Sequence, residues 1–270
     1  MDQALSIITV CYNDIENLKQ TIRSLDIQSV QQFEHIIIDG HSGDGTIDFL
    51  QQLEVKPGRS FISQKDQGIF DAMNKGAKLA KNKYLWFLNA GDLVYEKETI
   101  QKIYSKIESK SKEFDLISFK VLCKAENLEY FYGSKLKRKS LLLDMPFCHQ
   151  GVIINKNIFR RFEYNLDYSI IADFVLVESI ARSNGPYMHF DIPIAVYDLG
   201  GISSTRHDLE LRERFTFVKK EYQGVKLVRA TVKLLFIGIK YFSIKLSKSI
   251  GIYHFLKKIQ LALKITAHQL

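Results

Sequence analysis

Carboxylate and amide side chains follow the apolar runs of this sequence at the points where those runs end. The clearest case is the segment FLNAGDLVY, residues 87–95, in which a short apolar run gives way to a glycine and then to Asp92. Asn13, Asp39 with Asp44, and Asp66 follow three other apolar runs in the same manner. A carboxylate in such a place is either a ligand for a hard divalent cation or a loop residue that caps the next helix. The choice depends on whether the chain gathers these residues at one edge.

Apolar strands and amphipathic helices alternate through the first 95 residues. Strands are predicted over residues 5–11, 33–38, 60–63 and 84–88, and helices over 15–27, 46–53 and 71–81. Strands that alternate with helices at this spacing predict an α/β fold with a mostly parallel central sheet flanked by helices. The carboxyl ends of such strands form one edge of the sheet, and ligands bind there. The five polar residues are therefore expected to line a binding site.

The second half of the chain is less regular. A hairpin is predicted over residues 115–132, and a helix over 168–182 contains the segment IADFVLVESI. A strand is predicted in 189–203, with a turn at Gly200-Gly201.

Several classes of protein are disfavoured by the motifs. The sequence has no GxGxxG and no GxxxxGK[ST], so nothing indicates a dinucleotide-binding enzyme or a Walker-type NTPase. Its three cysteines are widely spaced and form neither a disulfide framework nor a zinc motif, which fits a reducing compartment. The first residues lack the pattern of a signal peptide. No apolar stretch reaches the roughly 18 uninterrupted residues that a membrane-spanning helix requires.

The net charge of +8 is concentrated at the C-terminus. Residues 219–270 contain eleven Lys and Arg and one acid, which gives +10 and leaves −2 on residues 1–218. This distribution argues against a nucleic-acid-binding face on the main domain. From about Val225 onward, five basic residues fall along one stripe of a helix among many apolar residues, a pattern typical of a basic amphipathic helix. Such a helix could attach to an anionic membrane surface or pack against the body of the protein.

Several motifs together resemble one known family. SIITVCYN, EHIIIDGHSGDGT and QKDQGIFDAMNKGAKLAKNKYLWFLNAGD are similar, in order and spacing, to segments of the family-2 glycosyltransferases with the GT-A fold. The likeness is greatest to the bacterial branch that builds surface polysaccharides. It is dense over residues 5–95 and thins to HQG, ADFVL and GGISS. It implies a GT-A domain over 1–218, with a nucleotide-binding half (1–95) and an acceptor half (96–218), followed by a basic amphipathic helical tail (219–270).

The resemblance implies roles for residues around a nucleotide-sugar donor. Asp39 would accept the N3–H group of uracil, although a turn aspartate that caps the next helix is an alternative, and Ser42 or Asp44 could supply that cap instead. Glu16 could equally be a first-turn acid favoured by the helix dipole. The residues expected beside the donor are Tyr12, Asn13, Glu16, Asp39, Asp66, Gly68, Asn74, Asn89 and Gly91.

The resemblance also implies the catalytic groups. Asp92 corresponds to the last acid of the family's DxD-type motif and would bind Mn²⁺ or Mg²⁺ against the diphosphate. Many members have two adjacent acids where this chain has Gly91-Asp92, so the protein would supply one carboxylate. Asp173, at the start of a predicted helix, would be the general base that deprotonates the acceptor. A helix-start aspartate that satisfies backbone amides is the alternative, and Glu178 is the other candidate for the base. His149 and Gln150 would lie on the acceptor side.

The resemblance implies a metal-dependent inverting glycosyltransferase that moves a hexosyl or N-acetylhexosaminyl group. The expected donor is a UDP-sugar, and the expected acceptor is a lipid-linked oligosaccharide of cell-surface polysaccharide synthesis. The expected location is cytoplasmic and peripheral, on the inner face of the plasma membrane, with the tail on anionic lipids. An alternative is a catalytically inactive relative that serves as a scaffold or a carbohydrate-binding module.

Overall fold

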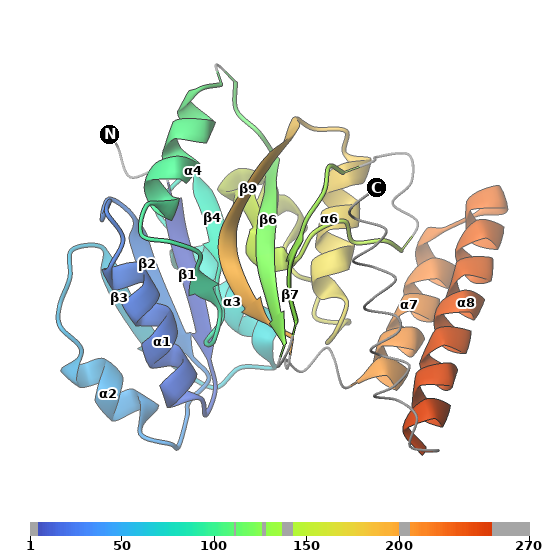
Figure 1. The fold of residues 1–270 in the computed structure, drawn as a ribbon, viewed down its shortest axis with the longest axis horizontal. Helices are drawn as coiled ribbons and strands as arrows, with labels where there is room; N and C mark the ends of the chain where they lie inside the picture. The colour runs from blue at the N-terminus through green and yellow to red at the C-terminus, as the bar shows by residue number, and fades with distance from the viewer. Residues whose placement is uncertain (1–4, 111, 126–127, 137–142, 200–205, 250–270) are drawn as a thin grey trace. The chain divides into compact units, whose positions relative to one another are not determined.

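The computed structural model describes residues 5–110, 112–125, 128–136, 143–199 and 206–249 (Figure 1). The chain divides into two compact units, residues 1–204 and 205–270, which we call the sheet unit and the helical unit. The division precedes the expected boundary at residue 218, because helix α7 (His207–Glu221) packs against the helix that follows it. The turn expected at Gly200-Gly201 lies outside the described residues.

The first half of the sheet unit is built from parallel strands connected by helices (Figure 1). Its elements are β1 (Leu5–Cys11), α1 (Ile15–Asp26), β2 (Glu34–Asp39), α2 (Thr46–Gln52), β3 (Arg59–Ser63), α3 (Ile69–Leu79) and β4 (Tyr84–Phe87). The strands lie in the order β3-β2-β1-β4, each parallel to its neighbour. β1, β2 and β4 are buried along their whole length, as their continuous apolar runs predict. All seven predicted elements are confirmed.

The second half extends the same sheet with strands of mixed direction. Its elements are β5 (Leu93–Val94), α4 (Thr99–Glu108), β6 (Leu116–Ala125), β7 (Leu128–Tyr132), the 3₁₀ turn η2 (His149–Gly151), β8 (Val152–Asn155), α5 (Lys156–Phe162), α6 (Ala172–Arg182) and β9 (Tyr187–Asp198). β8 pairs antiparallel with both β4 and β6, and β6 pairs parallel with β9. Because β8 begins directly after η2, the residues of η2 are brought to the carboxyl end of β4. The helix predicted from residue 168 begins at Ala172 instead.

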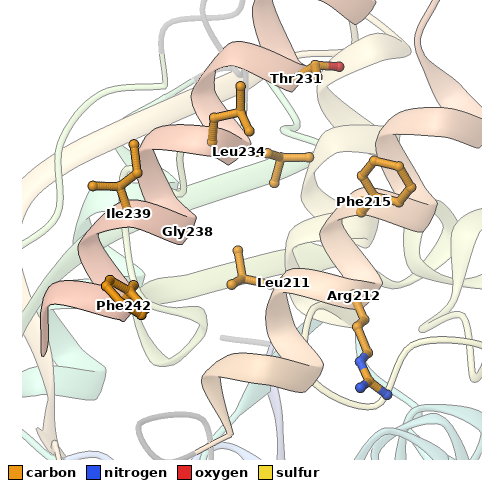
Figure 2. Close-up of a pocket in the computed structure, with 9 residues that line it drawn as sticks. Leu211, Arg212, Phe215, Thr231, Leu234, Gly238, Ile239 and Phe242 are labelled. Atoms are coloured by element: carbon orange, nitrogen blue, oxygen red, sulfur yellow. The ribbon is translucent and has the colours of Figure 1, made fainter. Parts of the chain in front are cut away.

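The helical unit consists of α7 and α8 (Gly224–Ser249), which lie side by side (Figure 1). The helices run antiparallel: the ring of His207, at the start of α7, stacks on Tyr241, far along α8, with centroids 4.2 Å apart. The Tyr241 hydroxyl also donates to Glu210 at 2.6 Å. Between the helices lies an apolar groove of about 590 Å³, with Phe215 on one side and Ile239 and Phe242 on the other (Figure 2). No helix in the described parts of the chain is long and apolar enough to cross a membrane.

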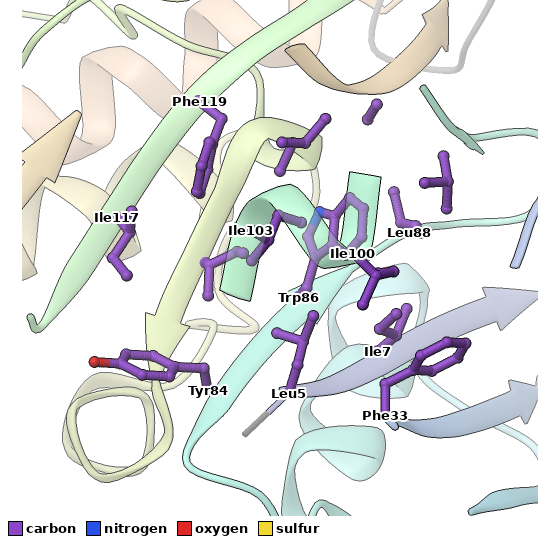
Figure 3. Close-up of a cluster of buried hydrophobic side chains, with 14 of the residues drawn as sticks. Leu5, Ile7, Phe33, Tyr84, Trp86, Leu88, Ile100, Ile103, Ile117 and Phe119 are labelled. Atoms are coloured by element: carbon purple, nitrogen blue, oxygen red, sulfur yellow. The ribbon is translucent and has the colours of Figure 1, made fainter. Parts of the chain in front are cut away.

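A large buried cluster of the sheet unit surrounds Trp86 on β4 (Figure 3). Ile7 of β1, Ile103 of α4 and Phe119 of β6 belong to the same cluster, and all four side chains are fully buried. The indole Nε1–H of Trp86 donates to the backbone carbonyl of Gln150 at 2.7 Å. The core therefore fixes the position of η2 beside β4.

Candidate functional site

The loops that follow β1 and β2 are joined to each other by polar contacts. The Asn13 N–H donates to Ser42 Oγ at 2.8 Å. The carboxylate of Asp44 accepts from the N–H of Ile15 at 3.0 Å and from that of Thr46 at 3.1 Å, which are the first residues of α1 and α2. Asp44 therefore satisfies a free N–H at the start of both helices. The sequence offered Asp39, Ser42 and Asp44 as candidates for the cap of α2, and the contact with the Thr46 N–H assigns that cap to Asp44.

Asp39 ends β2 and is completely buried, with a side-chain exposure of 0%. Its Oδ1 atom accepts from Ser42 Oγ at 2.5 Å, and its Oδ2 atom accepts from the Ser42 N–H at 3.1 Å and from Ser63 Oγ at 2.6 Å. A carboxylate offers about four acceptor positions, so three hydrogen bonds occupy most of them. In this conformation Asp39 fastens its loop to β3, and its contact with a base stays a prediction.

Tyr12, Asp66 and Gly68 lie together at the same edge. A side chain built on Gly40 would place its Cβ 2.7 Å from Asp66 Oδ2 and 3.1 Å from a ring carbon of Tyr12, so both side chains converge on this glycine. Asp66 Oδ1 accepts from the Gly68 N–H at 2.9 Å. Gly68 has φ = 120°, a backbone conformation that favours glycine, and it directly precedes α3. Because Tyr12 is 65% exposed, its ring offers an open surface on which a base could stack.

Two residues expected beside the donor have other contacts in the structure. Glu16 is exposed on α1 and pairs with Lys19 at 2.6 Å. Asn74 is buried on α3: its Oδ1 accepts from the Tyr164 N–H at 3.0 Å and its Nδ2 donates to the Tyr164 carbonyl at 2.9 Å. Both polar ends of Asn74 are used by this backbone. In this conformation Asn74 attaches α3 to the Tyr164 segment, and its contact with the donor stays a prediction.

Asp92 lies just beyond the carboxyl end of β4 in a buried, hydrogen-bonded position. Gly91 precedes it with φ = 95° and donates its N–H to the buried hydroxyl of Thr21 at 2.9 Å. Asp92 Oδ2 accepts from the Asn89 N–H at 2.9 Å, and Oδ1 accepts from Gln150 Nε2 at 3.1 Å. Asp92 is 5% exposed, and this burial raises its pKa to about 7, against the lowering effect of the two hydrogen bonds.

Asn89 and His149 complete this group, which we call the Asp92 cluster (Asn89, Asp92, His149, Gln150). Burial lowers the pKa of His149 to about 4, so the imidazole is neutral at physiological pH. Its Nε2 atom lies 3.2 Å from Asn89 Nδ2. The Oδ1 atom of Asn89 is buried and has no hydrogen-bond partner among the described residues. A buried acceptor without a donor is costly, and a ligand at this site would relieve that cost.

The donor atoms of the Asp92 cluster fit a hard divalent cation in part. Asp92 supplies a carboxylate and Asn89 an unpartnered amide oxygen, and Mg²⁺ and Mn²⁺ prefer oxygen ligands of these kinds. Among the described residues no group of three or more His, Cys, Asp or Glu side chains could hold a metal ion. A cation here would therefore need phosphate or water oxygens to complete its shell, as Mg²⁺ commonly does.

Asp173 lies in the first turn of α6, half-buried, close to the same region. Burial, and then the negative charge of Asp173, raise the pKa of the Tyr164 hydroxyl. The pKa of the Cys148 thiol is raised first by its hydrogen bond with Cys123 and by burial, and to a smaller extent by the charges of Asp173 and Asp92. Cys148 directly precedes His149. The charges of Asp173 and Asp92 thus both act on the Cys148 thiol.

Sequence reasoning missed the part played by Thr21. Its hydroxyl accepts from the Gly91 N–H and lies 2.9 Å from the Asp92 carbonyl, so it fixes the turn that presents Asp92. The signal available was a hydroxyl residue on the apolar face of α1, three residues after Leu18. The contact of Gln150 with Asp92 was also missed, because Gln150 was expected on the acceptor side.

Comparisons with known proteins agree on one family. The protein-family model described as Glycosyl transferase family 2 matches residues 6–167 of the chain. A PGL/p-HBAD biosynthesis glycosyltransferase of Mycobacterium tuberculosis (strain ATCC 25177 / H37Ra) is 30% identical over 237 residues, covering 84% of this chain and 89% of the relative. The putative teichuronic acid biosynthesis glycosyltransferase TuaG of Bacillus subtilis (strain 168) is 30% identical over 120 residues, covering 44% and 47%.

Two solved structures share the fold. S. aureus TarS 1-349 in complex with UDP-GlcNAc superposes with a TM-score of 0.64 at 13% identity, covering 88% of this chain and 73% of that one. The mannosyltransferase PcManGT from Pyrobaculum calidifontis, in complex with GDP-Man and Mn²⁺, gives 0.63 at 13% identity, covering 98% and 81%. These likenesses confirm the predicted α/β fold of the GT-A type.

Proposed function

Because the chain belongs to glycosyl transferase family 2, we propose that it transfers a sugar, with inversion, from a nucleotide-sugar to a lipid-linked saccharide. The observation that carries the proposal is the Asp92 cluster at the end of β4, with Asp173 close to it. The relatives named for PGL/p-HBAD and teichuronic acid biosynthesis support an acceptor in cell-surface glycan synthesis. The membrane-borne acceptor in turn supports a cytoplasmic, peripheral location at the inner face of the plasma membrane.

The donor would bind over the ends of β1, β2 and β3. The exposed ring of Tyr12 and the glycine-bounded turn at Asp66 and Gly68 leave room for a nucleoside there. Asn13 holds the neighbouring loop in place through Ser42. Structural relatives carry either UDP-GlcNAc or GDP-Man, so the preference for uracil depends on Asp39. A small movement of Ser42 would free one carboxylate oxygen of Asp39 for a hydrogen bond with the base.

Asp92 and the Oδ1 atom of Asn89 would hold Mn²⁺ or Mg²⁺. The cation, when bound, supplies a Lewis acid that neutralises the charge developing on the diphosphate leaving group. Gln150 and the Asn89 N–H orient the Asp92 carboxylate by donating to its two oxygens. Gln150 therefore acts on the donor side of the reaction. The neutral His149 keeps the Asn89 amide in place through the contact at Nδ2.

Asp173 would accept the proton of the acceptor hydroxyl. As that oxygen forms its bond to the anomeric carbon, the bond from this carbon to the diphosphate oxygen breaks, and the proton passes to the Asp173 carboxylate. Attack on the face opposite the leaving group inverts the anomeric centre. The position of Asp173 in the first turn of α6, half-buried and near the Asp92 cluster, supports this role.

The test is release of UDP or GDP by the purified chain, screened over several nucleotide-sugars with and without Mn²⁺. Asp92→Ala should lose the metal-dependent release. Asp173→Asn should keep nucleotide binding but lose transfer to an acceptor by about 10² to 10⁴-fold. Asp48→Asn, which changes an exposed acid on α2, is the matched control and should behave as the wild type.

Two outcomes would contradict the proposal. Binding of a nucleotide-sugar without turnover, in the presence of lipid-linked acceptors, would favour the inactive scaffold or carbohydrate-binding module. Failure to bind either nucleotide in the presence of Mn²⁺ would overturn the assignment of Asp92 and of the strand-end residues together.

A further inference from the structure

α8 exposes a continuous apolar face, which we define as Val225, Val228, Val232, Leu235, Phe236, Ile239 and Phe242. These side chains are between 47% and 74% exposed. At 100° per residue they occupy about 120° of the helix circumference. Isolated exposed apolar residues are ordinary in soluble proteins, but a contiguous patch of this kind marks an interaction site.

The groove between α7 and α8 extends this face. Leu235, Ile239 and Phe242 belong to both, and Leu211 and Phe215 of α7 form the opposite wall (Figure 2). The groove opens to the surface, since Phe215 is 57% exposed. The opposite side of α8 is used for packing within the unit, with Ala230 buried completely. Within the helical unit, α8 thus has one face for its neighbour and a second apolar face that α7 does not cover.

Cations border the apolar face along one edge. At 100° per residue, one side of Phe236 is occupied by three cations, Arg229, Lys233 and Lys226. The sequence of α8 contains no acid. An apolar face with basic residues at its border is the arrangement of helices that lie in the plane of a membrane interface. The cations meet lipid phosphates there while the apolar side chains enter the acyl boundary.

From this we infer that the helical unit docks on an anionic lipid surface, with the α8 apolar face and the α7–α8 groove inserted among the lipid chains. The charges argue against two other occupants. A second copy would bring the same cationic border against itself, which is unfavourable. Residues 250–270 carry Lys257, Lys258 and Lys264 and no acid, so this segment would not neutralise the border either. The inference rests on the peripheral location proposed above but not on the transfer reaction.

The first test is co-sedimentation of the full chain with phosphatidylcholine vesicles, with and without phosphatidylglycerol. We expect binding to the anionic vesicles that weakens with salt. The triple variant Leu235→Gln, Phe236→Gln, Ile239→Gln should bind at least about 100-fold more weakly, because three apolar side chains no longer leave water. Arg229→Gln should lose about fivefold on anionic vesicles and nothing on neutral ones. A matched triple, Ile27→Gln, Val55→Gln, Leu79→Gln, changes exposed apolar residues of the sheet unit and should bind as the wild type.

The second test reports directly how deeply α8 enters the lipid bilayer, and it does not depend on loss of binding. The sequence has one tryptophan, Trp86, which is fully buried. Phe236→Trp adds a second at the centre of the proposed contact, and vesicles with brominated acyl chains should quench its fluorescence. The wild type and Val55→Trp should not be quenched.

The outcomes separate the possible occupants. Binding that the α8 triple variant retains, or a Phe236→Trp signal that brominated lipid does not quench, would overturn the inference. Failure of the wild type to bind anionic vesicles would do so as well. Light scattering would then show whether a second copy covers the face, and truncation after residue 249 whether residues 250–270 do. Sugar transfer to a detergent-solubilised acceptor is measured separately, so failure of docking and failure of the proposed reaction are distinguishable.

Discussion

Replacement of Gln150 by leucine tests how the protein tunes Asp92, the carboxylate that we propose as a metal ligand. Gln150 is 1% exposed, and its Nε2 atom donates to Asp92 Oδ1 at 3.1 Å. Leucine has a similar volume but no donor. A hydrogen bond to a charged group contributes about 1.5 to 3 kcal/mol, and one pKa unit corresponds to about 1.4 kcal/mol. The pKa of Asp92, about 7 in the wild type, should therefore rise by about one to two units in Gln150→Leu.

This shift predicts a pH-dependent loss of metal affinity. A metal ligand must be deprotonated to bind, so at pH 7.5 the affinity for Mn²⁺ should fall about tenfold and should recover as the pH approaches 9. The assay is Mn²⁺ titration followed by electron paramagnetic resonance, at saturating UDP, over a range of pH. Gln28→Leu is the matched control, since Gln28 is also a buried amide but donates to the carbonyls of Ser24 and Glu96.

The result that would refute this reasoning is a variant whose Mn²⁺ affinity equals that of the wild type at pH 7.5. A loss of the same size at every pH would also refute it, because the hydrogen bond would then not act through ionisation. An equal loss in Gln28→Leu would assign the effect to general destabilisation.

Three further predictions concern stability. Because burial raises the pKa of Asp92 from 3.8 to about 7, the metal-free wild type should lose stability as pH rises through this window. The stability of Asp92→Asn relative to the wild type, measured by urea unfolding, should therefore be about 2 to 3 kcal/mol greater at pH 8 than at pH 5. An equal difference at the two pH values would contradict this. Asn74→Ala should destabilise the fold by about 2 kcal/mol through loss of both contacts with the Tyr164 backbone and leave UDP affinity in calorimetry within about twofold. A large loss of affinity would instead support the expected contact of Asn74 with the donor. Burial, and then the charge of Arg59, lower the pKa of His35 to about 3, so the folded state loses stability as pH falls below about 6.5, where His35 of the unfolded chain takes up a proton. His35→Gln should therefore flatten the pH dependence of the unfolding free energy below pH 6.5 by about 1.4 kcal/mol per unit. An unchanged slope would rule this out.

The elements of the fold could be predicted because their signals are local. The helix predicted over 15–27 is observed as Ile15–Asp26, and the continuous apolar run of 5–11 is β1 with the same bounds. The helix predicted from residue 71 begins two residues earlier, because Gly68 adopts a positive φ and lets α3 begin directly after it. The late start of α6 had no comparable signal, since residues 168–171 continue the helical pattern of the sequence.

The partners of the site residues were harder to predict because they are distant in sequence. The order of the strands places Asp39, Asp66 and Asp92 at one edge, and sequence reasoning reached that far. The contact of Gln150 with Asp92 spans 58 residues, and it exists because β8 pairs antiparallel with β4. The contact of Asn74 with Tyr164 spans 90 residues. No pattern within a single segment indicates such pairs.

The pairing of β4 with β8 also determines when the site comes into existence. β1 to β4 pair with one another within the first 87 residues, whereas β8 begins at Val152. Contacts of long sequence separation pay a larger loop-closure entropy and form later. A ribosome that adds about 5 to 20 residues per second synthesises Asp92 several seconds before Gln150. Until β8 docks beside β4, Asp92 therefore lacks the Gln150 amide that donates to its Oδ1 atom in the finished protein.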